Sequence, residues 1–219
     1  MKPFCSVIIC TYDRASLLPR ALDSLLAQSD CDWEAIIVDD GSSDETSAVV
    51  QPYLALCPNI RYFKRSINRG VAAARNIGVK LSAGQFVTFL DSDDEYAVDH
   101  LAVRKRILLS DAAIQMLHGG IRVVGDPFVV DKDNPSELIH LAECEVGGTF
   151  VIRRDVFLKV GGFNDLAYAE DSEFYEKAVS HGIKCQFVAH PSYIYYRNTA
   201  GQLTSQEIDS NLLSAILAN

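Results

Sequence analysis

Hydrophobic and polar residues in the first half of this chain follow two alternating patterns. Short continuous apolar runs rich in β-branched residues, typical of buried strands, cover residues 4–11, 33–38, 60–64 and 86–90. Between these runs, apolar residues recur every three or four positions and predict helices over residues 15–28, 46–56, 71–81 and 97–109. Strands that alternate with helices predict an α/β fold, with a mostly parallel central sheet and helices on both of its faces.

The pattern becomes less regular after residue 110. Residues 114–116 and 121–130 predict strands, and residues 172–181 predict a helix with an apolar inner side. Because no linker is long enough to separate two domains, we divide one domain into an α/β half, residues 1–110, and a mixed half, residues 111–205.

The last stretch, residues 206–219, contains the short amphipathic sequence "SNLLSAILAN" and predicts a C-terminal helix. We expect this helix to pack on the core, and pairing with a second subunit in a homodimer is the alternative interpretation. The stretch contains no Lys or Arg, which disfavours binding to anionic lipid.

Composition and charge exclude several classes of protein. Hydrophobic residues make up 48% of the chain, enough for a buried core, and the net charge of −9 disfavours nucleic acid as a partner. No apolar run approaches the roughly 18 residues of a transmembrane segment. The start, "MKPFCSVIIC", lacks a signal-peptide cleavage site, so we expect a cytoplasmic location, with peripheral attachment to a membrane left open.

The six cysteines form no Cys-x-x-Cys pair and do not cluster with the histidines, which disfavours a zinc site.

Three of the four predicted strands in the first half end in polar clusters. These clusters are "TYDR" after the first strand, "DDGSSD" after the second and "DSDD" after the fourth. In parallel sheets, ligands bind beyond the carboxyl ends of the strands. We therefore expect the three clusters to meet at one edge of the sheet and to form the functional site.

The densest of these clusters places four acids in five positions: Asp91, Asp93, Asp94 and Glu95. Like charges this close repel each other, so they need a partner. Asp91 and Asp93 are two residues apart, and in extended backbone such side chains point the same way, which suits a divalent cation such as Mg²⁺ or Mn²⁺. The alternative is a capped turn followed by a helix that begins with acids. The position at a strand end, beside two other polar strand ends, favours the metal site.

The ends of the first two strands supply further candidates. Asp39 and Asp40 are more acids than a helix cap needs, and one of them can accept hydrogen bonds from a base or a ribose. Thr11, Tyr12 and Asp13 end the first strand, where Tyr12 either lies against a flat ring or covers the sheet edge.

The stretch "NRGVAAARNIG" begins the third predicted helix with small residues. Gly70 and three successive alanines allow this end of the helix to approach a neighbour closely. Arg75 interrupts the small, apolar run. It is either a surface residue of an amphipathic helix or an arginine that reaches a nucleotide, and the residues alone leave both interpretations open.

Four segments occur in the order and spacing of family-2 glycosyltransferases: "SVIICTYDR", "IIVDDGSSD", "NRGVAAARNIGVKLSAGQFVTFLDSDD" and "VGGFNDLAYAEDSEFYEKAVSHGIK". "YIYYR" also falls where that family commonly ends its core domain. The resemblance covers about residues 3–200 and rests on several independent motifs. It implies a GT-A fold, in which a Rossmann-like nucleotide-binding half, residues 1–110, precedes a variable acceptor-binding half, residues 111–205.

The resemblance also implies roles for the residues at the strand ends. Thr11 and Tyr12 line the nucleotide pocket, and Asp13 stands where the family usually has Asn. Asp40 hydrogen-bonds the base. Arg75 falls where the family has a basic or polar helix residue, so we count it among the nucleotide-binding candidates.

The same resemblance assigns the metal and the chemistry. Asp93 is implied as the principal ligand of Mn²⁺ or Mg²⁺, and Asp91 lies near the ribose and the metal. The pair Glu170 and Asp171 matches the position of the catalytic base. A positioned carboxylate can take the proton of an acceptor hydroxyl as the new bond forms. Asp171 is preferred over Glu170, and the alternative is that Asp171 only caps the following helix.

Two departures from the family pattern narrow the activity. Processive members carry Gln-x-x-Arg-Trp, whereas the single tryptophan here is Trp33, so we expect transfer of one sugar at a time. Many relatives have a His shortly after their Tyr-Arg, where this chain has Asn198 and Thr199. The metal is then expected to depend on Asp93, the diphosphate and water.

The sequence as a whole predicts a metal-dependent glycosyltransferase of polysaccharide biosynthesis. We expect a nucleotide-sugar donor, and the resemblance to the family favours a UDP-sugar. The acceptor is expected to be a hydroxyl group of a glycan, of a lipid-linked molecule or of another molecule. Transfer is expected to invert the anomeric carbon. A dinucleotide oxidoreductase is disfavoured because Gly-x-Gly-x-x-Gly is absent. The alternative from another class is a non-catalytic module that binds a nucleotide sugar without transferring it.

Overall fold

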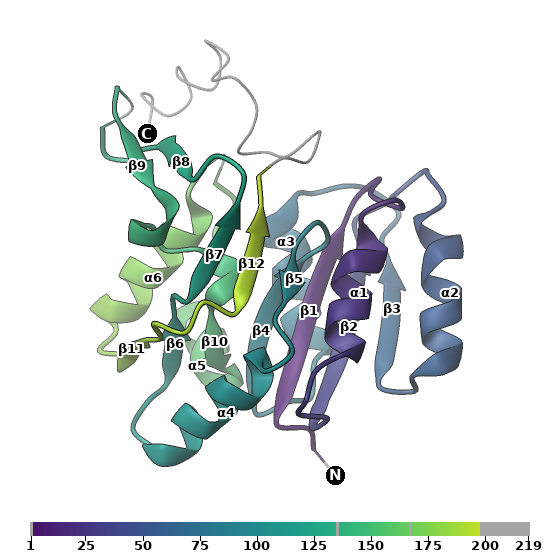
Figure 1. Ribbon diagram of the computed structural model, residues 1–219, viewed down its shortest axis with the longest axis horizontal. Coiled ribbons are helices and arrows are strands. Elements are labelled where there is room, and N and C mark those ends of the chain that lie inside the picture. The colour runs from purple at the N-terminus through teal and green to yellow at the C-terminus, as the bar shows by residue number, and fades with distance from the viewer. Residues whose placement is uncertain (1, 135, 167, 198–219) are drawn as a thin grey trace.

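A seven-stranded sheet forms the centre of the computed structural model, which describes residues 2–134, 136–166 and 168–197 (Figure 1). The strands lie in the order β11-β6-β10-β4-β1-β2-β3. Their bounds are β1 Cys5–Thr11, β2 Trp33–Asp39, β3 Ile60–Lys64, β4 Phe86–Asp91, β6 Met116–His118, β10 Val151–Arg153 and β11 Cys185–Phe187.

Parallel pairing dominates this sheet. β1 pairs in parallel with β2 and β4, β2 with β3, and β6 with β11, while β10 alone runs antiparallel to its neighbours β4 and β6. The predicted α/β fold with a mostly parallel sheet is therefore confirmed. Three strands of the second half belong to the same sheet as the first half.

Helices cover both faces, as predicted. One face carries α1 Leu18–Leu26, α2 Thr46–Leu56 and α4 His100–Ser110, and the other carries α3 Val71–Leu81, α5 Arg154–Val160 and α6 Glu170–Ser180. Figure 1 shows α1 in front of the sheet and α3 behind it. Successive residues of β1 separate the two cores, since Val7 and Ile9 pack in one and Ile8 packs in the other.

The second half differs from its prediction in the number and length of its strands. The single strand expected over residues 121–130 is two strands, β7 Ile121–Val124 and β8 Phe128–Val130, because Gly125 has φ +111° and Pro127 follows. β8 pairs with β9 Leu138–His140, and β7 forms a small sheet with β5 Glu95–Tyr96 and β12 Tyr193–Tyr196. Two 3₁₀ turns, η1 Leu141–Glu143 and η2 Gly147–Thr149, precede β10.

Close packing of α3 on the sheet depends on Gly78. A Cβ at this position would lie 2.3 Å from Ile8 Cγ2 and 3.3 Å from Val38 Cγ2, so only glycine allows the helix to come this near. The close approach expected at Gly70 is not made to another described residue, because a Cβ there would meet nothing nearer than 3.9 Å. Gly78 lies one turn after Arg75 on the same helix face, and it thereby brings that arginine to the sheet.

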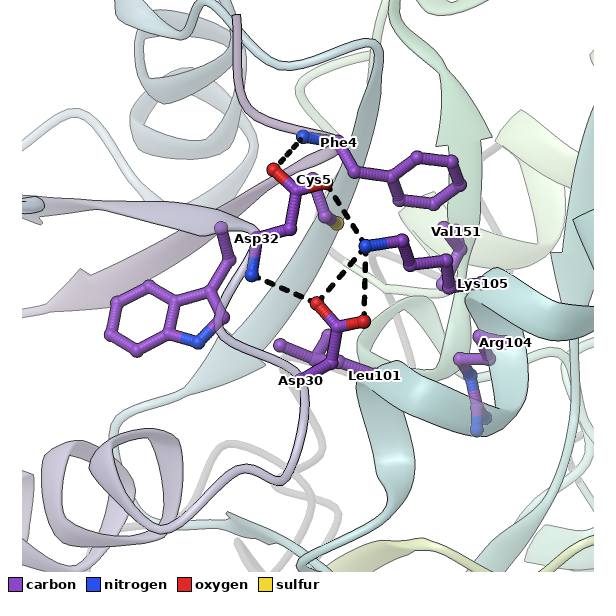
Figure 2. A pocket seen from close by; sticks show the side chains of 9 residues that line it. Phe4, Cys5, Asp30, Asp32, Leu101, Arg104, Lys105 and Val151 are labelled. Carbon is purple, nitrogen blue, oxygen red and sulfur yellow. Dashed lines mark hydrogen bonds and ion pairs between the residues drawn. The ribbon is translucent and has the colours of Figure 1, made fainter. Parts of the chain in front are cut away.

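The amino-terminal edge of the sheet is closed by packing and ion pairs (Figure 2). Lys105 Nζ lies 3.0 Å from Asp30 and 2.9 Å from Asp32, and its ammonium lies 5.1 Å from the centre of the Phe4 ring. The cavity at this edge measures about 10 Å³, which is room for about one water molecule. This pocket is therefore too small to hold a ligand.

Two expectations concern the membrane and the chain end. Within the described ranges, no helix is both long and apolar enough to cross a bilayer. The helix predicted over residues 206–219 lies outside the described residues.

We expect Gly78→Ala to lower the free energy of unfolding by about 1–3 kcal/mol, because the new methyl group meets the branched side chain of buried Ile8. Intrinsic helix propensity acts in the opposite direction and favours Ala by about 1 kcal/mol. The sign of the change, measured by urea denaturation, therefore separates close packing from propensity.

The control for this prediction is the same substitution in an Ile8→Ala background. Removing Ile8 Cγ2 removes the obstruction, so the cost of Gly78→Ala should shrink or reverse there. An equal cost in both backgrounds would contradict the packing explanation.

Candidate active site

A cleft of about 1070 Å³ opens at the carboxyl ends of β1, β2 and β4. Its other wall comes from residues 129–133 and 139–147 and from the start of α6. All the candidate site residues from the sequence line this one cleft: Thr11, Tyr12, Asp13, Asp40, Arg75, Asp91, Asp93, Glu170 and Asp171. The volume suits a ligand larger than an ordinary small molecule, for which clefts of about 300–1,000 Å³ are usual.

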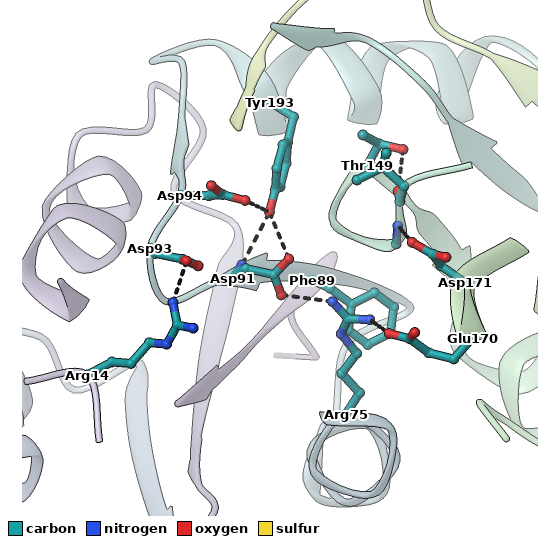
Figure 3. Close-up of polar contacts among 12 residues, drawn as sticks. Arg14, Arg75, Phe89, Asp91, Asp93, Asp94, Thr149, Glu170, Asp171 and Tyr193 are labelled. Atoms are coloured by element: carbon teal, nitrogen blue, oxygen red, sulfur yellow. Dashed lines mark hydrogen bonds and ion pairs between the residues drawn. The ribbon is translucent and has the colours of Figure 1, made fainter. Parts of the chain in front are cut away.

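The first two acids after β4 are each paired with an arginine (Figure 3). Asp91 accepts a hydrogen bond from Arg75 at 2.8 Å, and Asp93 forms an ion pair with Arg14. Arg20 donates to the backbone carbonyl of Asp93 at 2.9 Å. The acids therefore find partners within the protein itself, which offsets the repulsion among them.

The third acid, Asp94, has a different role because it is buried and bonded to β12. The Tyr193 hydroxyl donates to Asp94 Oδ2 at 2.8 Å, and the Tyr196 backbone N–H donates to Oδ1 at 2.8 Å. Burial, with Asp91 and Asp93 nearby, raises the pKa of Asp94 well above its usual value. The Tyr193 hydroxyl also accepts from the Asp91 N–H at 3.3 Å, so β12 holds the acidic loop in place.

Gly148 makes room for Tyr193. A Cβ at Gly148 would lie 2.3 Å from the Tyr193 ring, so this tyrosine reaches the acidic loop only past a residue without a side chain. Sequence reasoning missed both residues. The pair "GG" in "EVGGTF" was the available signal, since adjacent glycines in a mixed segment indicate a close approach.

Arg75 lies at the centre of the cleft floor. Only 5% of the residue is exposed, and its guanidinium lies beside the rings of Phe89 and Phe163, at 5.8 and 5.4 Å from their centres. One amino group donates to Asp91 at 2.8 Å and the other to Glu170 at 3.0 Å. The interpretation of Arg75 as a surface residue is therefore wrong.

Asp171 lies in the first turn of α6 and faces the cleft. Its carboxylate accepts hydrogen bonds from the Gly147 N–H and the Ser172 N–H, both at 2.9 Å. Burial and the neighbouring Glu170 raise the pKa of Asp171 to about 6. The residue that caps the helix is Ala169, with φ +57°, so the alternative in which Asp171 is only a helix cap is wrong.

The end of β1 meets the loop after β2. Asp13 accepts hydrogen bonds from the backbone N–H groups of Ser43 at 2.7 Å and Asp44 at 3.2 Å. The Thr11 hydroxyl oxygen is buried without a hydrogen-bond partner among the described residues, and Tyr12 is 45% exposed at the rim. Thr11 thus offers the cleft an unused polar group.

The two acids at the end of β2 have separate environments. Asp39 is fully buried and accepts from the Ser42 N–H at 2.7 Å and from the Tyr62 hydroxyl. Asp40 forms an ion pair with Arg65 at 2.7 Å and borders the cleft. Asp39 therefore holds the turn, and Asp40 is the acid of the two that a ligand can meet.

The cleft as a whole is strongly acidic. Among the described residues, eleven carboxylate side chains line it, against three cationic ones: Arg14, Arg75 and Lys132. No three His, Cys, Asp or Glu side chains in the described part of the chain cluster as a complete metal site. Asp91 and Asp93 offer carboxylate oxygen atoms, the ligand type of hard cations such as Mg²⁺ and Mn²⁺, and would be the residues that hold such an ion.

The relatives of this chain are glycosyltransferases. An uncharacterised glycosyltransferase of Haemophilus influenzae is 31% identical over 181 residues, which is 77% of this chain and 60% of the relative. An Escherichia coli protein, the UDP-Glc:alpha-D-GlcNAc-diphosphoundecaprenol beta-1,3-glucosyltransferase WfgD, is 28% identical over 67% of this chain and 58% of its own length. The chain spans 17–60% of the length of the first curated relatives it matches.

Solved structures agree on the fold. Staphylococcus aureus TarS 1-349 in complex with UDP-GlcNAc has a TM-score of 0.79 at 22% identity, over 96% of this chain and 64% of that one. The mannosyltransferase PcManGT from Pyrobaculum calidifontis, in complex with GDP-Man and Mn²⁺, has a TM-score of 0.74 at 21% identity, over 92% of this chain and 59% of that one. The fold is the GT-A fold expected from the sequence.

The model of Glycosyl transferase family 2 matches residues 6–115, half of the chain, and this match covers β1 to β4 with the polar strand ends that form the cleft floor. The matched motifs and the relatives agree with this assignment. The chain therefore belongs to glycosyltransferase family 2.

Proposed function

We propose that this protein is a non-processive glycosyltransferase that moves one sugar from a UDP-sugar to an acceptor hydroxyl and requires Mn²⁺ or Mg²⁺. The observation that carries the proposal is the single cleft in which Asp91 and Asp93 face the start of α6 with Asp171. A site for a diphosphate and a site for a base must adjoin if a sugar is to pass between two bound molecules.

Charge supports the requirement for a metal. A nucleoside diphosphate is an anion, and eleven carboxylates against three cationic side chains would repel it from the cleft. Asp91 and Asp93 are the residues that hold a divalent cation between the protein and the diphosphate. When bound, such a cation neutralises the charge that develops on the departing diphosphate.

The donor's nucleoside belongs, in this proposal, at the ends of β1 and β2. Thr11 supplies a buried hydroxyl without a protein partner among the described residues, Tyr12 an exposed ring and Asp40 a carboxylate at the cleft border. UDP is the preferred nucleotide because TarS was solved with UDP-GlcNAc and WfgD is named for UDP-Glc, whereas PcManGT was solved with GDP-Man.

Asp171 is the proposed base. Its pKa of about 6 leaves it ionised near neutral pH and keeps it basic enough to take a proton from a hydroxyl as the hydroxyl attacks. Attack from the side opposite the diphosphate inverts the anomeric carbon. The acceptor, a glycan or lipid-linked sugar of polysaccharide biosynthesis, would enter along residues 129–133 and 139–147 of the second half, the wall that contacts Asp171 through Gly147.

We expect UDP together with Mn²⁺ to raise the melting temperature by roughly 5–10 °C at a hundredfold excess over the dissociation constant. UDP without Mn²⁺ should have little effect, because the acidic cleft repels the free diphosphate. Differential scanning fluorimetry measures both conditions.

Asp93→Ala should abolish this stabilisation, since it removes the proposed principal metal ligand. Asp30→Ala is the matched control, because Asp30 lies at the closed edge of the sheet and has no contact with the cleft. An unchanged response in Asp93→Ala would contradict the assignment of the metal ligand.

Asp171→Asn should slow UDP release from a UDP-sugar by roughly 10²–10⁴-fold, because the base is lost while the donor site remains. In the wild-type protein the rate should fall as the pH drops below about 6, since protonated Asp171 cannot accept a proton. A pH profile of kcat/KM measures both effects.

Asp155→Asn, at the exposed start of α5, is the matched control and should leave the rate unchanged. Tight binding of UDP-sugar with no UDP release from the wild-type protein would instead favour a non-catalytic binding module.

A further inference from the structure

Arg75 connects the two walls of the cleft. The arginine comes from α3, and its guanidinium donates at 2.8 Å to Asp91, after β4, and at 3.0 Å to Glu170, at the start of α6 (Figure 3). Burial against the rings of Phe89 and Phe163 holds the guanidinium in this position. A planar guanidinium with donors on two sides holds two carboxylates of separate elements in a fixed relative geometry, which the flexible, compact ammonium of a lysine does not impose.

The first turn of α6 depends on such an external contact. Its capping residue, Ala169, adopts the left-handed conformation with φ +57° and supplies no side-chain hydrogen bond. The turn also carries the adjacent acids Glu170 and Asp171, and the negative charge of Glu170 raises the pKa of Asp171, which disfavours its ionised form. The Arg75 ion pair with Glu170 compensates for both weaknesses, because it adds a positive charge and ties the turn to α3.

We propose that Arg75 is a positioning residue for the base, which fixes Asp171 toward the cleft by holding Glu170. This inference rests on the proposed function and changes two assignments made from the sequence. Arg75 is no longer a nucleotide contact, and Glu170 is no longer an alternative base, since its carboxylate is bound to Arg75. The carboxylate of the neighbouring Asp171 accepts a hydrogen bond from the Gly147 N–H, and Asp171 lines the cleft.

Electrostatics give this role a measurable signature. The charged and titratable groups that face Asp171 are Glu170 on α6, Arg75 on α3, and Cys144 and Tyr168 on the segments beside it. Glu170 raises the pKa of Asp171, and Arg75 lowers it. Removing the charge of Glu170 should therefore lower the pKa of Asp171, and removing the charge of Arg75 should raise it.

The first experiment needs no substrate. Carbon-13 NMR of the side-chain carboxyls, assigned with Asp171→Asn, follows the titration of Asp171 in the nucleotide-free protein. Arg75→Met should move its midpoint up by roughly one pH unit, and Glu170→Gln should move it down. Arg75→Lys should move it little, since the positive charge is kept. Shifts in the same direction, or no shifts, would overturn the proposal.

The second experiment measures function, with UDP-glucose, UDP-GlcNAc and Mn²⁺ as probes and water as the acceptor. Arg75→Lys should slow UDP release by roughly 10–100-fold, because the ammonium lacks the planar fork that fixes the relative position of the two carboxylates. Combining it with Glu170→Gln should cost little more, since both variants break the same link. Fully additive losses would overturn the proposal.

Arg154→Lys is the matched control. Arg154 binds the opposite end of α3, through hydrogen bonds to the Val79 carbonyl at 3.2 Å and the Ser82 hydroxyl at 3.1 Å, and does not border the cleft. This variant should lose stability and keep its rate of UDP release. An equal loss of rate in Arg154→Lys would reduce Arg75 to a purely structural residue of α3.

Calorimetry with UDP and Mn²⁺ separates this inference from the proposed function. If UDP fails to bind the wild-type protein, the proposed donor site is wrong. If UDP binds and Arg75→Lys weakens only that binding, with an unchanged rate of release, Arg75 contacts the donor and the positioning role is wrong.

Discussion

Repulsion among carboxylates at one edge of the sheet is the constraint on which the rest of this structure depends. Like charges about 4 Å apart repel by roughly 4 kcal/mol near a protein surface, and Asp91, Asp93 and Asp94 lie within four consecutive positions. The protein compensates with Arg75 from α3, Arg14 from the segment before α1, and Tyr193 from β12. Elements far apart in the chain are thus tied to one short loop.

This arrangement explains why packing far from the cleft matters to it. Gly78 lets α3 approach Ile8 of β1, and the same helix carries Arg75 to the acids. Gly148 lets the Tyr193 ring pass to Asp94. In both cases a residue without a side chain decides whether a distant polar group reaches its partner, so core geometry and site electrostatics are determined together.

Local patterns were sufficient to predict the first half, because each of its elements carries its own periodicity, and α2 and α3 begin and end at the predicted residues. The strands that the structure describes in the second half have three or four residues each, too few for a periodic signal. The candidate acids Asp40, Asp91 and Asp93 were found because they end or directly follow strands, whereas Glu170 and Asp171 were found through the family resemblance. Their partners Tyr193 and Gly147 were not, because contacts across 99 and 24 residues leave no local pattern.

The bond between Asp94 and Tyr193 also has a consequence for how the protein is made. The segment from β1 to β4 emerges from the ribosome long before β12, the strand whose Tyr193 binds the acidic loop. Chains are synthesised at about 5–20 residues per second. For several seconds the nascent chain carries a row of carboxylates without its final anchor. We expect it to acquire a competent cleft only when β12 has emerged, late in translation.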